Sequence, residues 1–180
     1  MKTKKSPVLT LTFAAIIAAM YTAMTLLIPA PAYNIAQFRV SEMLTILPIF
    51  TTSAIPGLAV GCAISNLVGI AVNPAGAWDI LIGSLTTLAA AGLTYRLRNI
   101  KWFNLPIAAT LPPVLLNAVI IGAELTIAIY NPPYSISQFL INMCWVGGGQ
   151  LLACTACGLI FYSALERLNV RQRLPGLNNN

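Results

Sequence analysis

An arginine and a glutamate stand three residues apart in a stretch that is otherwise apolar. Arg39 and Glu42 belong to the polar run 37–42, and on a helix they would share one face and could form an ion pair. Ionisable side chains within a membrane are costly and usually face a cavity or a binding site. We therefore expect both residues to line a polar pocket. The alternative is a pair that neutralises itself and anchors a helix end at the membrane interface.

Other lone polar side chains are expected at the same depth as this pair. Asn117 and Glu124 are seven residues apart and so share one helix face, and Asn142 and Trp145, three apart, share another. Asp79 begins an apolar run, where a helix–helix hydrogen bond or a charge at a helix N-terminus explains it as well as a ligand does.

Together these groups could hold a small, planar, polar ligand. Carboxylates accept hydrogen bonds from N–H groups, amides both donate and accept, and an indole stacks on a ring. The candidate substrate-binding residues are Gln37, Arg39, Glu42, Asp79, Asn117, Glu124, Asn142 and Trp145.

The composition places the chain in a membrane. Of its 180 residues, 58% are hydrophobic and 8% are charged, and the mean hydropathy is +0.80. A soluble domain carries about 25% charged residues, so this chain has too few of them to cover a soluble surface. We expect an all-α integral membrane protein that forms a single membrane domain over residues 1–180.

The apolar runs and the turns between them predict six transmembrane helices, at roughly 7–28, 38–50, 54–72, 78–95, 105–129 and 137–165. The net charge is +6, and nine of the ten basic residues lie in three clusters beside apolar runs, which does not favour a nucleic-acid partner. Six spans place all three clusters on one side of the membrane, as the positive-inside rule requires, and both termini in the cytoplasm. Fusing two of the runs would put one basic cluster outside.

The first apolar run has two interpretations. A basic start, an apolar run and the small residues Ala30-Pro31-Ala32 resemble a secretory signal peptide. The apolar run is about 20 residues long, whereas the core of a signal peptide has about 7–15 residues. We therefore expect a retained membrane helix.

Small residues form a strip along this first helix. Residues spaced four apart lie on one helix face, where small side chains let another helix approach closely in lipid. The spacing alone leaves open whether the strip packs within this protein or docks another membrane subunit. The candidate docking residues are Ala14, Ala15, Ala18, Ala19 and Ala23.

The chain offers few groups for catalysis or metal binding. It has no histidine, and its four cysteines all lie within apolar runs. Cys154 and Cys157 form a C-x-x-C pair, but a zinc site needs more ligands, and small packing residues explain the pair better. Only carboxylates remain for chemistry. We expect no metal, no cofactor and no enzymatic activity, with an intramembrane enzyme as the alternative.

The polar run belongs to a longer pattern that covers nearly the whole chain. Its segments are Gln37-Phe38-Arg39-Val40-Ser41-Glu42, Leu44-Thr45-Ile46-Leu47-Pro48, Ala54-Ile55-Pro56-Gly57, Gly61-Cys62, Asn66-Leu67, Asp79-Ile80, Gly83-Ser84-Leu85, Thr94-Tyr95-Arg96, Val114-Leu115-Leu116-Asn117-Ala118 and Gly122-Ala123-Glu124-Leu125. This pattern resembles the QueT family, which are substrate-binding S components of energy-coupling factor (ECF) transporters.

The resemblance implies the six-transmembrane-helix S-component fold in a bacterial cell membrane, with a pocket near the outer face capped by the loop between the first two spans. It also implies that the alanine strip docks a transmembrane coupling subunit, which works with two ATPase subunits. The implied substrate is a queuosine precursor, a deazaguanine-type base. Gln150 stands where the family pattern has an acidic residue, so no carboxylate role is assigned there. The alternatives are an S component for another ring compound, such as a vitamin, and a stand-alone carrier.

Overall fold

The computed structural model describes residues 7–33 and 38–170, and these are helical apart from turns and short connections. Gln37 lies outside the described residues. In chain order the elements are α1 (Pro7–Leu27), α2 (Pro29–Ala32), the 3-10 helix η1 (Val40–Ile49), α3 (Ala54–Val68), α4 (Trp78–Leu97), α5 (Ile107–Ile129), α6 (Ile136–Gln150), the π-helix η2 (Leu151–Cys157) and α7 (Gly158–Arg167).

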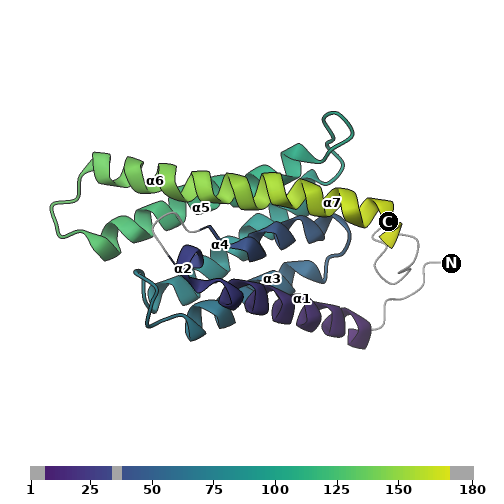
Figure 1. Ribbon diagram of the computed structural model, residues 1–180, viewed down its shortest axis with the longest axis horizontal. Helices are drawn as coiled ribbons and strands as arrows, with labels where there is room; N and C mark the ends of the chain where they lie inside the picture. Colours follow the sequence, from purple (N-terminus) through teal and green to yellow (C-terminus); the bar gives the residue numbers. More distant parts are fainter. Residues whose placement is uncertain (1–6, 34–37, 171–180) are drawn as a thin grey trace.

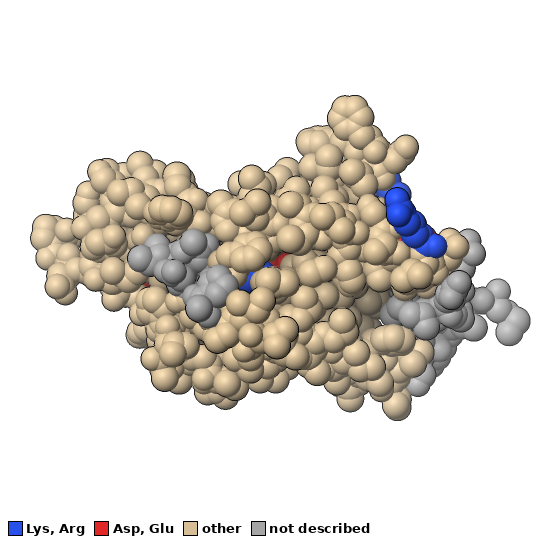
Figure 2. Space-filling view, viewed as in Figure 1, with Lys and Arg blue, Asp and Glu red and all other residues tan. Residues whose placement is uncertain are grey.

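The helices run up and down along the long axis of the molecule. In Figure 1, α1 begins and α7 ends at the right end, and the turns from α3 to α4 and from α5 to α6 lie at the left end. Basic side chains gather at the right end of the face shown in Figure 2, and most of the remaining described surface of that face is uncharged. We call the right end the basic end and the left end the opposite end.

Four helical stretches are long and apolar enough to cross a membrane. They are α1, α4, α5 and the continuous stretch Ile136–Arg167, which comprises α6, η2 and α7. Two shorter apolar helices, η1 and α3, complete the bundle. This result agrees with the all-α membrane architecture that the composition predicts. The expected range 54–72 is longer than α3, because the helix ends at Val68 and Gly69 begins a turn.

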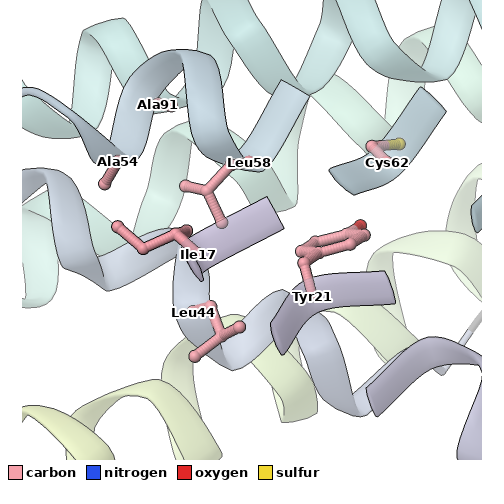
Figure 3. Close-up of a cluster of buried hydrophobic side chains, with 7 residues drawn as sticks. All are labelled: Ile17, Tyr21, Leu44, Ala54, Leu58, Cys62 and Ala91. Atoms are coloured by element: carbon pink, nitrogen blue, oxygen red, sulfur yellow. The ribbon is translucent and has the colours of Figure 1, made fainter. Parts of the chain in front are cut away.

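The short helix η1 lies in the centre of the bundle. Its Leu44 packs with Ile17 and Leu58 in one apolar cluster (Figure 3), and its Ile46 and Ile49 belong to a second cluster. A 3-10 helix rises about 2.0 Å per residue, so ten residues reach about 20 Å, less than the roughly 30 Å of a bilayer core. A short, non-α segment is tolerated at this depth because protein, not lipid, surrounds it.

Helices α1 and α3 approach each other closely through two glycines. A Cβ placed on Gly61 would lie 2.8 Å from the Tyr21 Cβ and 2.9 Å from the Ala18 carbonyl oxygen. Gly57 is equally tight, because a Cβ there would lie 2.7 Å from the Ala14 carbonyl oxygen. Small residues at such contacts let helix backbones pack tightly in lipid.

This contact divides the alanine strip into two faces. Ala14 and Ala18 lie against α3, and Ala18 is 5% exposed. Ala15, Ala19 and Ala23 are exposed on the outer side of α1. The first pair therefore packs within this protein, whereas the other three form a flat surface with no partner among the described residues.

Replacing Gly61 with valine should destabilise the fold. The branched side chain would force α1 and α3 apart, at a cost of about 1–3 kcal/mol. Gly92→Val is the matched control, because a Cβ on Gly92 meets nothing within 4 Å. Thermal unfolding in detergent should show a lower midpoint for Gly61→Val and a nearly unchanged one for Gly92→Val. Equal midpoints would contradict the described contact between α1 and α3.

Candidate binding site

Arg39 forms its ion pair with Asp79 rather than with Glu42. The Arg39 Nη2 atom donates to the Asp79 Oδ2 atom at 2.8 Å, and the two side chains are 4% and 1% exposed. The expected pairing with Glu42 assumed a helix. Arg39 instead precedes η1 in an extended conformation, with φ −100° and ψ 113°, so the helical three-residue spacing does not apply to it.

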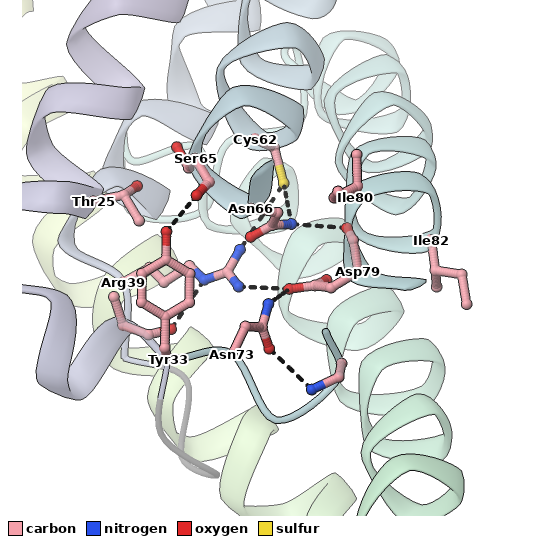
Figure 4. A network of polar contacts seen from close by, with 12 residues as sticks. Thr25, Tyr33, Arg39, Cys62, Ser65, Asn66, Asn73, Asp79, Ile80 and Ile82 are labelled. Carbon is pink, nitrogen blue, oxygen red and sulfur yellow. Dashed lines mark hydrogen bonds and ion pairs between the residues drawn. The ribbon is translucent and has the colours of Figure 1, made fainter. Parts of the chain in front are cut away.

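Two asparagines complete the surroundings of Asp79 (Figure 4). The Asn73 side chain donates to the same Asp79 oxygen at 2.7 Å, and the Asn66 side chain donates to the Asp79 backbone carbonyl at 2.8 Å. Asp79 also lies in the first turn of α4, where the helix dipole favours a negative charge. The carboxylate is thus held at the start of α4 by α3, by the turn before α4 and by Arg39.

The same arginine binds the segment that follows α1. Its Nε atom donates to the Ala32 carbonyl at 3.1 Å, and its guanidinium carbon lies 5.4 Å from the centre of the Tyr33 ring. The Tyr33 hydroxyl in turn donates to the Ser65 carbonyl at 2.6 Å. A Cβ on Gly69 would overlap the Tyr33 ring, so only glycine leaves room for the ring there. Arg39 and Tyr33 therefore hold the segment that follows α1 against α3 and α4.

Glu42 lies in a separate polar cluster. It accepts a hydrogen bond from the Tyr21 hydroxyl of α1, and its other oxygen lies 4.0 Å from the Cys154 sulfur of η2. The Cys154 thiol donates to the Gln150 side-chain oxygen at 3.1 Å. Glu42 is 2% exposed, so its contacts are made within the bundle.

Glu124 is a buried carboxylate for which the described part of the chain provides no hydrogen-bond donor. The residue is 6% exposed, and within residues 7–33 and 38–170 no donor contacts either of its oxygens, both of which are buried. Its side chain helps to line a cavity of about 320 Å³ between α4 and α5, with Trp78, Ile82, Ile127 and Ala128. The charges of Asp79 and Arg39 act on Glu124, which places it near the ion pair.

The remaining predicted residues divide between the interior and the surface. Asn117 is 5% exposed, and Asn142 is 1% exposed and donates to the Thr126 hydroxyl at 3.0 Å. Trp145 is 59% exposed and lines a shallow groove with Cys144 and neighbouring apolar residues. The structure therefore separates Trp145 from Asn142, although their spacing predicted a shared face.

Several residues of these clusters were not among the predicted binding residues. Tyr21, Asn66, Asn73 and Cys154 contact the predicted carboxylates or lie beside them. The two asparagines could have been found, because a lone amide in an apolar run needs a partner for the same reason as a lone charge does. Nothing in their spacing marks Tyr21 and Cys154, because they meet Glu42 only in the folded bundle.

Comparison with known proteins identifies the family. A family model described as QueT transporter matches residues 11–167, which is most of the chain. The chain belongs to the QueT transporter family. Together with the four apolar helices, this membership makes it a multi-pass membrane protein.

One curated relative of the family supports this assignment. The chain is 36% identical over 93 residues to a queuosine precursor transporter QueT of Lactococcus lactis subsp. cremoris (strain MG1363). The aligned part covers 50% of this chain and 52% of the relative, so the chain spans about half the length of the curated relative that it matches. No solved structure matches the chain.

The Arg39–Asp79 pair should show strong coupling in a double-mutant cycle. Arg39→Gln or Asp79→Asn alone leaves one charge buried without its partner, which costs about 3–5 kcal/mol. The double variant removes both charges and should lose clearly less than the sum of the two single losses. Chemical unfolding in detergent measures all four proteins. Additive losses would show that the two side chains do not interact as described.

Proposed function

We propose that the chain is the substrate-capturing subunit of an ATP-driven ECF importer that binds a queuosine precursor, a deazaguanine-type base. Family membership supports transport, and the name of the Lactococcus relative supports the substrate. The observation that carries the proposal is the buried carboxylate of Glu124, which has no donor among the described residues and lies beside a cavity. In a transporter, such a group is best explained by a ligand that supplies the donor.

The proposed orientation has six spans, both termini in the cytoplasm and the pocket near the outer face. The basic end of the bundle then lies in the cytoplasm, as the positive-inside rule favours. The helices α1 and α7 begin and end at this basic end, and Asp79 lies at the start of α4 at the opposite end. The short helices η1 and α3 count as two of the six spans, and the neighbouring helices shield η1 from lipid.

The proposed partners are a transmembrane coupling subunit and two ATPase subunits. The exposed face of the alanine strip, formed by Ala15, Ala19 and Ala23, supports a docking role because it is flat and unpaired within the described chain. The buried face, formed by Ala14 and Ala18, packs against α3 within this protein instead. The proposal therefore assigns docking to these three residues, with Ala14 and Ala18 behind them.

Purified protein in detergent should bind a deazaguanine base saturably. Glu124→Ala and Arg39→Ala should each abolish binding or greatly weaken it, because each removes a buried charged group at the site. Glu166→Ala at the end of α7 is the control and should bind normally. Calorimetric titration measures the affinities, and fluorescence-detected gel filtration checks that each variant folds. A wild-type protein with no saturable affinity for any deazaguanine would overturn the proposed substrate.

One bulky substitution on α1 can distinguish docking of the coupling subunit from binding of the ligand. Ala19→Trp should leave ligand binding intact but stop ATP-driven uptake, because the indole would hold the coupling subunit away from α1. Met20→Trp is the matched control, because Met20 is also exposed on α1 but points about 100° away from Ala19. Uptake of labelled ligand into cells that express the whole transporter gives the readout. Normal uptake by Ala19→Trp would refute the docking assignment.

A further inference from the structure

We propose that the groove between Leu105 and α7, at the basic end of the bundle, binds an anionic phospholipid. In this arrangement Lys101 and Arg167 hold the phosphate of the headgroup, and an acyl chain lies along the apolar part of the groove. The groove is a different surface from the candidate binding site, so this inference does not depend on the proposed substrate.

The groove is large and its lining is almost wholly apolar. It has a volume of about 630 Å³, and α7 contributes every lining residue except Leu105, which precedes α5. Ile160 is 72% exposed and lies on the side of α7 that faces the groove. The Ser163 hydroxyl donates to the Leu159 carbonyl at 2.8 Å, so it has no hydrogen left for a ligand. Arg167 is therefore the one lining side chain that can donate to a bound molecule.

Positive charge surrounds this groove. Four basic side chains and one acidic side chain of residues 7–33 and 38–170 lie at the basic end (Figure 2). The basic residues are Arg96, Arg98, Lys101 and Arg167, and the acidic residue is Glu166. The Lys101 Nζ atom reaches the helix that forms the groove and lies 5.9 Å from the centre of the Tyr162 ring. Basic pockets between membrane helices are typical sites for anionic lipid headgroups.

A turn with two exposed aromatic residues adjoins the groove. Trp102 and Leu105 exchange two backbone hydrogen bonds of 2.9 Å each and thereby close the turn. Between them, Phe103 and Asn104 have φ 52° and 63°, a left-handed conformation that a bulky residue such as phenylalanine rarely adopts. The turn leaves Phe103 95% exposed and Trp102 54% exposed. Tryptophan is enriched at the depth of lipid headgroups, so the turn suits the interface where the proposed phosphate lies.

The combination of an apolar groove with cations near it favours a lipid over a soluble anion. A soluble anion would gain nothing from the apolar lining, whereas an acyl chain fits it. Acyl chains are as apolar as leucine side chains, so they do not distinguish one phospholipid from another. The preference therefore comes from the headgroup, and each basic side chain near a membrane surface raises the affinity for anionic lipid about fivefold.

Quenching of Trp102 fluorescence by brominated lipids tests the proposal. Trp78→Phe together with Trp145→Phe leaves Trp102 as the last of the three tryptophans. Vesicles contain brominated phosphatidylglycerol or brominated phosphatidylcholine with the same acyl chains. The anionic lipid should bind about 5- to 30-fold more tightly, the range for one or two basic side chains. Native mass spectrometry of the unsubstituted protein, which counts the lipids that it retains, gives the same comparison with all tryptophans in place.

Lys101→Gln combined with Arg167→Gln should remove this preference, because both proposed phosphate ligands lose their charge. Arg96→Gln is the matched control and should keep the preference, because Arg96 is exposed at the same end but does not line the groove. Gel filtration checks that each variant folds.

Three results would overturn the proposal. The first is equal affinity for the two lipids, or a preference that survives in the variant without both cations. The second is an equal loss of preference in Arg96→Gln, which would indicate a diffuse surface charge instead of a site. The third is weak quenching by both lipids, which would show that protein covers the groove.

Discussion

The cost of burying charge in a lipid-embedded bundle governs the structure. A carboxylate or guanidinium removed from water requires a partner, and the penalty for an unpaired charge is several kcal/mol. Arg39 and Asp79 meet this requirement by forming an ion pair, and Asn73 provides a second donor to Asp79. Glu42 meets it with the Tyr21 hydroxyl. Each solution joins elements that are distant in sequence, so the polar clusters, like the apolar clusters, hold α1, η1, α3 and α4 together.

Two departures from α-helical geometry lie next to each other in the middle of the bundle. The tight 3-10 helix η1 packs against the wide π-helix η2, and Glu42 and Cys154 approach each other across this contact. A π-helix within an α-helix is rare and often occurs at a functional site. Here it continues α6 after Gln150, and shortly before it Gly147 lies close to α5, because a Cβ on Gly147 would be 3.3 Å from the Ala118 Cβ. The irregular backbone of both segments is thus found where Glu42 and Cys154 approach each other.

The sequence was a good guide to the helices and a partial guide to the site. Apolar runs of about twenty residues between turn residues define α1, α4 and α5 without any tertiary information, because length and hydropathy determine such helices. The geometry of η1 could not be predicted in this way, because its conformation depends on the burial that the other helices provide. The predicted pairing of Arg39 with Glu42 was wrong for a related reason. The helical spacing rule needs a helix, and the backbone at Arg39 is extended.

Helical spacing alone predicted shared helix faces with mixed success. Asn117 and Glu124 are both buried on α5, as their spacing of seven predicted. Trp145 was misplaced relative to Asn142, because two residues three apart can lie on either side of the boundary between core and lipid. The alanine strip was similarly ambiguous, and the close approach of Gly57 and Gly61 decides which alanines face inward.

The central claim is that the protein binds a flat, N–H-rich heterocycle. The binding site is buried, is rich in hydrogen-bond acceptors and lies at the end of the bundle opposite the basic residues. Mass spectrometry of the small molecule retained by gently purified protein tests this claim most directly. The account predicts a retained deazaguanine with N–H donors, present with wild-type protein and absent from Glu124→Ala. A retained anion, or a ligand without N–H donors, would contradict it.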